Sequence, residues 1–372
     1  MFEKLDIIIP QYNEDEKKIK PLLTSLENQI GVNLNKYINV TIVNDHSDMK
    51  LSEDFLKLFS FPITYLETPQ NGGGGDARQW GIDHTSNPLI MFCDADDRFF
   101  DCCALINLYN AMKNNNSPME WKIMYSDFYE EQYSEDGYDL IRHDSPSAIW
   151  LHGKVFRRSF LEQYNIRFIP GLRSFEDTYF GNMVALLSAP QEQLHCHYFT
   201  YLWCKNPQSV TAQWTREKKD YLYWNYQDYV TCNKSVIDNV YAIDPKNPGL
   251  PQTILIDIFF SFFVCQLKEF EPTEQDDIQE IIKRRNSYVN FIYYLINTYI
   301  DLIKLPPNKM RMAYWTARKD MYRYGMYHDT MLWNDFIIGS VKAGKIGKDA
   351  RYLMVNNLLP EKQICYSAAA SV

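Results

Sequence analysis

The sequence predicts an α/β fold, a mostly parallel sheet sandwiched by helices, followed by a mainly helical C-terminal domain. Short apolar runs alternate with segments that suit helices from residue 6 to residue 128, which is typical of right-handed strand–helix–strand units. Polar clusters follow these runs at their C-terminal ends, and helix-like segments broken by prolines follow residue 212. We therefore expect a sheet-containing domain at residues 1–212 and a helical domain at residues 213–372.

Four apolar runs predict the parallel part of the sheet. The first run, residues 6–10, ends at Pro10 and leads into a polar loop. The next runs are at residues 40–43 and 63–66, and residues 15–29, 52–59 and 77–82 suit the connecting helices. The fourth run, residues 89–92, has Asn87 and Pro88 before it and carboxylates after it, so it predicts a buried strand.

The chain then predicts a helix to about residue 114 and a further strand at residues 121–128. The acidic segment at residues 130–139 should form an exposed hairpin or loop, and residues 149–158 should return toward the sheet. Residues 168–179 predict a loop that enters a helix at Glu176 and Asp177. Acids at a helix start are often caps or dipole partners, so this pair alone does not identify a site.

Composition narrows the class of protein. Hydrophobic residues make up 46% and aromatic residues 15%, which predicts packed cores rather than long disorder. A net charge of −9 argues against attraction of the whole surface to nucleic acid. Eight cysteines without CxxC spacing suggest a reducing cytoplasm. The longest apolar run, residues 254–265, is short for a bilayer and contains Asp257, so we expect neither a signal peptide nor a transmembrane segment.

Three carboxylates, Asp94, Asp96 and Asp97, follow the fourth run. Open parallel sheets place their ligand crevice at this end of the strands. Crowded carboxylates repel one another and lose hydration, so we expect a compensating cation. Mg²⁺ or Mn²⁺ carrying a phosphorylated substrate would supply it. The alternative is a solvated turn after a strand.

A run of four glycines precedes the helix at residues 77–82. Such a loop allows close backbone approach and can present N–H groups to an anion at a helix start. It matches neither the phosphate-binding loop nor the dinucleotide motif, so a plain flexible loop is the alternative. Arg78, one turn into the helix, favours the anion site because its guanidinium can fork onto phosphate or a base edge.

Taken together and in order over residues 4–212, these segments resemble the inverting family-2 glycosyltransferases, whose nucleotide-sugar-binding fold is called GT-A. IPQYN at residues 9–13 looks like the opening P-x-Y-N signature. VNDHSD at residues 43–48 resembles V-D-D-G-S-x-D, with Asn44 and His46 as departures. NGGGGDARQWG at residues 71–81 is similar to N-x-G-x-x-x-A-R-N-x-G. DAD at residues 94–96 sits at the metal-binding D-x-D motif, and residues 176–177 sit at the E-D that contains the base. The closing Y-R…S-V-T segment is matched by residues 201–203 and 209–211, without its arginine.

The resemblance implies a role for each matched residue. Tyr12 would pack against the nucleotide base and Asp45 would hydrogen-bond it. Asp94 would lie near the ribose, and Asp177, beside Glu176, would take the proton from the acceptor hydroxyl. The donor-binding residues implied are Pro10, Tyr12, Asn13, Asp45, Gly72, Arg78, Asp94 and Lys154. The metal ligands implied are Asp96, Asp94 and, from the pair His195 and His197, His197, although histidines satisfied within a strand are the alternative.

The leading hypothesis is a metal-dependent, inverting hexosyl- or pentosyltransferase that uses Mn²⁺ or Mg²⁺. It would move a single sugar from a nucleoside diphosphate sugar, with UDP as the expected nucleotide, to a hydroxyl of a glycan or lipid-linked glycan. One alternative acceptor is a hydroxylated base in phage DNA. Alternatives of another class are a nucleotidyltransferase and an inactive nucleotide-sugar-binding module.

The C-terminal region differs in charge from the whole chain. Residues 304–351 hold ten Lys or Arg against four acids, and residues 309–319 interleave bases with aromatic residues. A solvated helix with aromatic residues facing the core explains this pattern. An anionic membrane surface with a lipid-linked acceptor would also suit it, and so would a nucleic-acid acceptor. We expect this domain to bind the acceptor or to form a homo-oligomer, in a cytoplasmic protein that could also be peripheral to the inner face of the membrane.

Overall fold

The computed structural model describes residues 2–115, 117–134, 137–144, 150–206, 226–246, 278–303 and 330–354. The chain divides into two compact units. Unit 1 comprises Met1–Lys218 and Thr231–Ile243, and unit 2 comprises Lys219–Val230 and Asp244–Val372. Our expected single boundary after residue 212 therefore differs from this division, in which part of a later helix joins unit 1.

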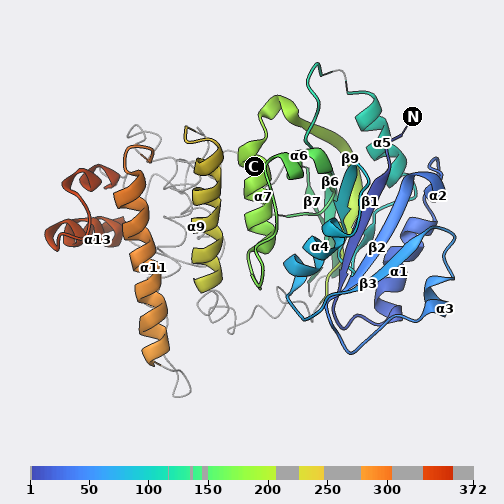
Figure 1. Cartoon of the computed structure of the whole chain (residues 1–372), viewed down its shortest axis with the longest axis horizontal. Helices are drawn as coiled ribbons and strands as arrows, with labels where there is room; N and C mark the ends of the chain where they lie inside the picture. The colour runs from blue at the N-terminus through green and yellow to red at the C-terminus, as the bar shows by residue number, and fades with distance from the viewer. Residues whose placement is uncertain are drawn as a thin grey trace. The chain divides into compact units, whose positions relative to one another are not determined.

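Unit 1 is built on one nine-stranded sheet (Figure 1). Its strand order is β3-β2-β1-β4-β8-β6-β9-β5, and β7 pairs with β6. The strands are β1 (Leu5–Gln11), β2 (Ile38–Asn44), β3 (Ile63–Glu67), β4 (Leu89–Phe92), β5 (Arg98–Phe99), β6 (Ile123–Ser134), β7 (Gly137–His143), β8 (Lys154–Arg157) and β9 (Gln193–Trp203). The helices are α1 (Glu16–Glu27), α2 (Leu34–Tyr37), α3 (Glu53–Leu56), α4 (Gly74–Asp83), α5 (Ala104–Lys113), α6 (Arg158–Gln163), α7 (Glu176–Leu187) and the short η1 (Pro190–Glu192).

The first four strands are parallel, as their sequence predicts. Side chains alternate between the two faces of a strand, and β1 shows the result. Ile7 and Ile9 belong to the core cluster that also contains buried residues of α1 and α5. Ile8 points the other way, where a Cβ added to Gly81 of α4 would lie 2.4 Å from Ile8 Cγ2. The sheet is thus covered by helices on both faces.

Beyond β4 the sheet is mixed. Strand β8 runs antiparallel to β4 and β6, and β6 runs parallel to β9. The acidic segment forms the expected hairpin, β6 with β7, but Glu131 within it is buried and paired with Arg98 at 3.0 Å. Because β1, β2, β3 and β4 are parallel, their C-terminal ends lie at the same edge of the sheet. The polar segments that follow these strands therefore meet there.

The described part of unit 2 is helical. It holds the first residues of α9 (Tyr226–Ile243), α11 (Ile278–Tyr299), α13 (Thr330–Lys342) and the short η2 (Lys348–Leu353). Trp333 is fully buried, and its Nε1 donates to the Leu353 carbonyl at 3.0 Å. Two of the helix-like segments that the sequence shows after residue 212, residues 253–270 and 311–324, lie outside the described residues. The basic residues between 304 and 329 also lie outside them. No described helix is both long and apolar enough to cross a bilayer.

Candidate active site

The acidic loop after β4 carries the carboxylates of Asp94, Asp96 and Asp97. Asp97 has a structural role, and the other two belong to the candidate active site. Asp97 is 1% exposed, and it accepts hydrogen bonds from the Tyr201 hydroxyl at 2.7 Å and the Cys204 amide at 2.8 Å. The Tyr201 oxygen also accepts from the Asp94 amide at 3.0 Å. Tyr201 of β9 therefore fixes the loop, and Asp94 and Asp96 are left partly exposed.

Arg78 connects this loop to helix α7. It is 7% exposed; its Nη2 lies 2.6 Å from Asp94 Oδ1, and its Nη1 lies 3.3 Å from Glu176 Oε1. Burial alone would raise the pKa of Asp94, but the charge and hydrogen bond of Arg78 hold that pKa below its usual value. Burial, and then the neighbouring Asp177, raise the pKa of Glu176 to about 7. The guanidinium of Arg78 thus bonds a carboxylate that lies 98 residues further along the chain.

The glycine loop makes this connection possible. Gly73 precedes α4 with a φ of 95°, a conformation that suits glycine. A Cβ on Gly74 would lie 3.1 Å from Arg78 Nη1, and a Cβ on Gly75 would lie 3.0 Å from Glu176 Cβ. The absence of side chains therefore lets the start of α7 and the arginine pack against the start of α4.

Asp45 holds this loop in place. Its Oδ1 accepts from the Gly72 amide at 2.9 Å and its Oδ2 from the Gly73 amide at 2.7 Å, while Thr68 Oγ1 donates to Oδ1 at 3.2 Å. Asp45 is 2% exposed. Both of its oxygens accept hydrogen bonds within the protein, so Asp45 positions the loop. Its expected contact with the nucleotide base stays a prediction.

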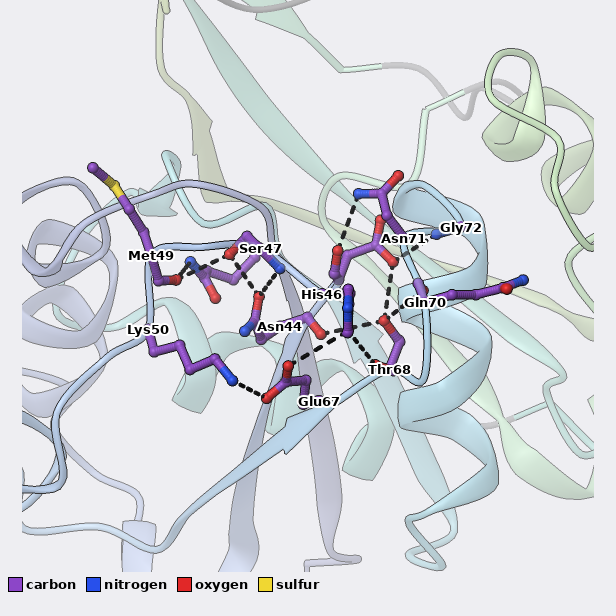
Figure 2. A network of polar contacts seen from close by, with 12 residues as sticks. Asn44, His46, Ser47, Met49, Lys50, Glu67, Thr68, Gln70, Asn71 and Gly72 are labelled. Atoms are coloured by element: carbon purple, nitrogen blue, oxygen red, sulfur yellow. Dashed lines mark hydrogen bonds and ion pairs between the residues drawn. The ribbon is translucent and has the colours of Figure 1, made fainter.

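Figure 2 shows why the two departures from the family motif are tolerated. His46 stands where the motif has glycine and adopts a φ of 51°, a left-handed conformation that histidine enters more readily than most residues. Its ring nitrogen lies 3.3 Å from the Thr68 carbonyl. Asn44, which replaces an aspartate, accepts from the Ser47 amide at 3.0 Å and from the Ser47 hydroxyl at 2.7 Å. Both side chains are therefore bonded locally, within the turn or to the neighbouring Thr68.

Asp177 lies at the start of α7, beside Glu176. Its Oδ1 accepts from the Thr178 amide at 2.6 Å, and no described residue donates a hydrogen bond to its Oδ2. Burial raises the pKa of Asp177, partly offset by the charge of Arg78. Lys154 of β8 is 4% exposed and donates to the Trp150 carbonyl. Burial lowers the Lys154 pKa to about 7 against the opposing effect of Asp177, so the two groups interact.

Residues of the opening signature lie at the same sheet edge. Pro10 is in β1 opposite Val43, Tyr12 just beyond β1 is 53% exposed, and Asn13 has a φ of 60°. Glu14, which sequence analysis did not single out, accepts from the Tyr12 amide at 2.5 Å. Burial raises the Glu14 pKa, and the charge of Asp96 adds to the rise, so Glu14 also borders the acidic loop. Its signal in the sequence is its position directly after the signature.

His152 is a second residue that sequence analysis missed. Its Nδ1 lies 3.7 Å from Asp97 Oδ2, and its ring stacks on those of Tyr201 and Trp203 at 5.2 and 5.0 Å. Burial lowers the His152 pKa to about 4, so the imidazole is neutral at physiological pH. No family motif covers His152, and only its placement two residues before Lys154 could have drawn attention to it.

The prediction that His197 completes a metal site with Asp96 is not supported by its position. The ligand atoms of His197 group with those of His195 and Asp127. Hydrogen bonds to the acidic loop come from Tyr201 of β9 and from two residues that follow β9, Cys204 and Asn206. Because a strand advances about 3.3 Å per residue, His197 lies well along β9 from that loop. The structure therefore separates His197 from Asp94 and Asp96.

The oxygen atoms of Asp94 and Asp96 fit a hard divalent cation. Burial, and then the charge of Asp94, raise the pKa of Asp96, which shows that negative charge is crowded at this position. Asp96 Oδ2 accepts from the Asn206 side chain at 2.7 Å, a bond that orients the carboxylate. Carboxylate oxygens are the ligands that Mg²⁺ and Mn²⁺ prefer. Asp97 already accepts hydrogen bonds from Tyr201 and Cys204, although its ligand atom also lies within 4.8 Å of those of Asp94 and His152.

These features define an α/β domain of the GT-A type, with a glycine loop, an acid pair and a helix-borne carboxylate at one sheet edge. Residues 6–175 match the model of glycosyl transferase family 2. The match over these residues confirms the resemblance seen in the motifs.

Two curated relatives are longer proteins. Over 237 residues the chain is 26% identical to glycosyltransferase GlyA of Streptococcus pneumoniae, which covers 58% of this chain and 32% of that protein. It is also 26% identical over 190 residues to a teichoic acid poly(glycerol phosphate) polymerase of Staphylococcus epidermidis, covering 47% of this chain and 25% of that one. The chain thus spans about a third or less of the length of these two relatives.

A solved structure shares the fold over most of the chain. S. aureus TarS 1-349 in complex with UDP-GlcNAc aligns with a TM-score of 0.58 at 15% sequence identity. The alignment covers 88% of this chain and 93% of that one. The GT-A fold class predicted from the sequence is confirmed.

Proposed function

We propose that this protein is an inverting, metal-dependent glycosyltransferase that moves a single sugar from a UDP-sugar to an acceptor hydroxyl. The observation that carries the proposal is the position of Arg78, which bonds both the acidic loop after β4 and the start of α7. A donor held at the loop is then next to Asp177, because Glu176 and Asp177 are adjacent.

Asp177 is the proposed general base. Glu176 is bonded to Arg78, whereas Asp177 Oδ2 accepts no hydrogen bond from the described residues and can accept one from a sugar hydroxyl. Burial raises the pKa of Asp177, which makes its carboxylate a better proton acceptor. Glu176 then has a positioning role through Arg78. Attack by the hydroxyl on the face of the anomeric carbon opposite the leaving group inverts that carbon.

Asp94 and Asp96 are the residues that would hold Mg²⁺ or Mn²⁺. When bound there, such a cation neutralises charge on the leaving diphosphate. Lys154 lies close enough to Asp177 for their charges to interact, and its cationic form would bind a donor phosphate. Tyr12 is exposed at the same edge and offers its ring to the base, with Pro10 and Asn13 shaping the loop around it.

The choice of UDP is supported by the fold shared with TarS, whose structure contains UDP-GlcNAc. We propose a glycan or lipid-linked glycan as acceptor, with the helical unit contributing acceptor binding or self-association. A cytoplasmic location, with peripheral attachment to the membrane, fits this acceptor. The family match favours sugar transfer over the nucleotidyl transfer considered from the sequence.

The test is turnover of a panel of nucleotide sugars, measured as release of the nucleoside diphosphate. Hydrolysis of the donor, with water as acceptor, provides a readout before the acceptor is identified. Asp177→Asn should lower kcat by about 10²–10⁴-fold while donor affinity is retained. The matched control is Asp54→Asn, since Asp54 is an exposed acid in the first turn of α3.

Chelation provides the second arm. EDTA should abolish turnover, and Mn²⁺ or Mg²⁺ should restore it. Full activity of Asp177→Asn would exclude this residue as the base, and full activity under chelation would exclude the metal. Release of pyrophosphate instead of a nucleoside diphosphate would identify a nucleotidyltransferase.

A further inference from the structure

A cluster of metal-ligating side chains lies outside the candidate active site. One ligand atom from each of Asp127, His195 and His197 lies within 4.8 Å of the others. His195 Nε2 is 2.7 Å from Asp127 Oδ1, and the rings of His195 and His197 are 3.9 Å apart. Asp127 comes from β6 and both histidines come from β9.

A bulge in β9 brings the two histidines together. Ser126 of β6 pairs with Cys196, but the next residue, Asp127, pairs with Phe199. His197 and Tyr198 are therefore extra residues in β9. Alternate residues of a regular strand share a face, and a bulge re-aims its side chains. The imidazole of His197 consequently lies against that of His195, above the carboxylate on the neighbouring strand.

The charge of Asp127 calls for a cation. Asp127 is 5% exposed, and within the described part of the chain its one hydrogen-bond partner is His195. A buried carboxylate is costly unless it is paired or binds a metal. His197 is exposed, so solvent can reach this group of atoms.

We propose that Asp127, His195 and His197 form a binding site for Zn²⁺. Two imidazole nitrogens and one carboxylate oxygen are ligands typical of zinc, and three protein ligands leave a fourth position for water. The donor set differs from the oxygen atoms of Asp94 and Asp96, which suit Mg²⁺ or Mn²⁺. The ion would link β6 to β9 across the bulge and so stabilise unit 1. The proposal does not depend on the sugar-transfer function.

The experiment uses the tag-free full chain, stripped of metal. Equilibrium dialysis against Zn²⁺ with elemental analysis should find one tightly held ion per chain, and Zn²⁺ should raise the melting temperature. Co²⁺ in its place should give the visible absorption of a site with nitrogen ligands. His197→Ala is the main variant because His197 is exposed and its loss leaves the bond between His195 and Asp127 intact.

Zinc affinity should fall more than about 100-fold in His197→Ala and in Asp127→Asn, because loss of even an outer partner of a metal ligand costs about 10–100-fold. Two control variants should keep the tight ion. His84→Ala removes another exposed histidine, and Asp96→Asn removes a carboxylate of the candidate active site. The proposal is overturned if the wild-type chain holds no tight Zn²⁺. It is equally overturned if His197→Ala binds Zn²⁺ as well as the wild type, or if Asp96→Asn is the variant that loses it. Circular dichroism confirms that each variant is folded.

Discussion

Replacement of Arg78 tests whether one guanidinium holds the candidate active site together. Arg78→Ala removes two charge-assisted bonds, at 2.6 Å to Asp94 and 3.3 Å to Glu176. It also leaves these two carboxylates and that of Asp177 without their shared cation. Arg78→Lys keeps the charge, but a single ammonium group does not reproduce the fork that spans two acids.

The magnitude follows from burial. Breaking a buried ion pair costs about 3–5 kcal/mol. The side chain of Arg78 is 9% exposed but that of Asp94 is 34% exposed, so water relieves part of the penalty. We therefore expect the lower end, about 3 kcal/mol, for Arg78→Ala. Arg78→Lys loses one charge-assisted bond and should cost about 2 kcal/mol. These are large fractions of a total stability of about 5–15 kcal/mol.

The assay is urea unfolding with hydrogen exchange read out in peptides of α4 and α7, because the two units can unfold separately. The control is Arg167→Ala, which breaks an ion pair with Asp83 whose side chains are 43% and 45% exposed and should cost less than about 1 kcal/mol. Since Arg78 lowers the pKa of Asp94, the deficit of Arg78→Ala should shrink as acid protonates Asp94. Equal losses for the Arg78 and Arg167 variants would refute the bridging role.

Three further predictions follow from the same contacts. The Lys154 pKa of about 7 means that its charge is lost above that pH, so the KM for the donor should rise above about pH 7. Lys154→Gln should raise KM below about pH 7, where the wild-type lysine is charged, and so flatten this profile in steady-state kinetics. The Glu176 pKa is raised from 4.5 to about 7, so the stability that protonated Glu176 contributes is present below about pH 4.5 and is lost as pH rises through 7. Glu176→Gln should remove this pH dependence from urea midpoints measured between pH 4.5 and 8. An unchanged slope of midpoint against pH would contradict the assignment. Gly81→Ala should lower the free energy of unfolding by about 1–3 kcal/mol, because the added Cβ would lie 2.4 Å from Ile8 Cγ2. Gly339→Ala is the contrasting variant, in a helix where no described atom lies within 4 Å of the added Cβ. It should raise the free energy of unfolding by up to about 1 kcal/mol, and thermal unfolding measures both variants.

The sequence predicted the features of unit 1 that depend on local pattern. The parallel strands are short apolar runs, and the polar residues that follow them necessarily meet at one sheet edge. This is why Arg78 and Asp94 could be expected together, whereas the place of Asp177 at the same site was implied by the family resemblance. The antiparallel pairing of β8 was not predictable in the same way, because the apolar pattern of a strand does not indicate the direction in which it runs in the sheet.

The contacts of the other site residues depend on long-range detail. The position of Asp45 after β2 was predicted, but the amides that occupy its carboxylate belong to Gly72 and Gly73, which follow the next strand. His197 was placed with the acids because its distance along β9 and the bulge beside it leave no signature in the sequence. His152 carries no motif, and its interaction with Asp97 appears only when β8 and β9 are both placed in the sheet.

The loops of the candidate site are fixed by side chains that need never touch a substrate. Tyr201 orders the acidic loop through Asp97, Asp45 holds the glycine loop, and Arg78 joins α4 to α7. Each of these three is nearly buried, and the groups proposed to meet the donor or acceptor, Tyr12 and Asp177, are at least partly exposed. A catalytic group that is displaced by about 1 Å can lose about 100-fold in rate. Substitutions at the buried anchors should therefore reduce kcat through geometry, and the exposed groups should determine which sugar and which hydroxyl are accepted.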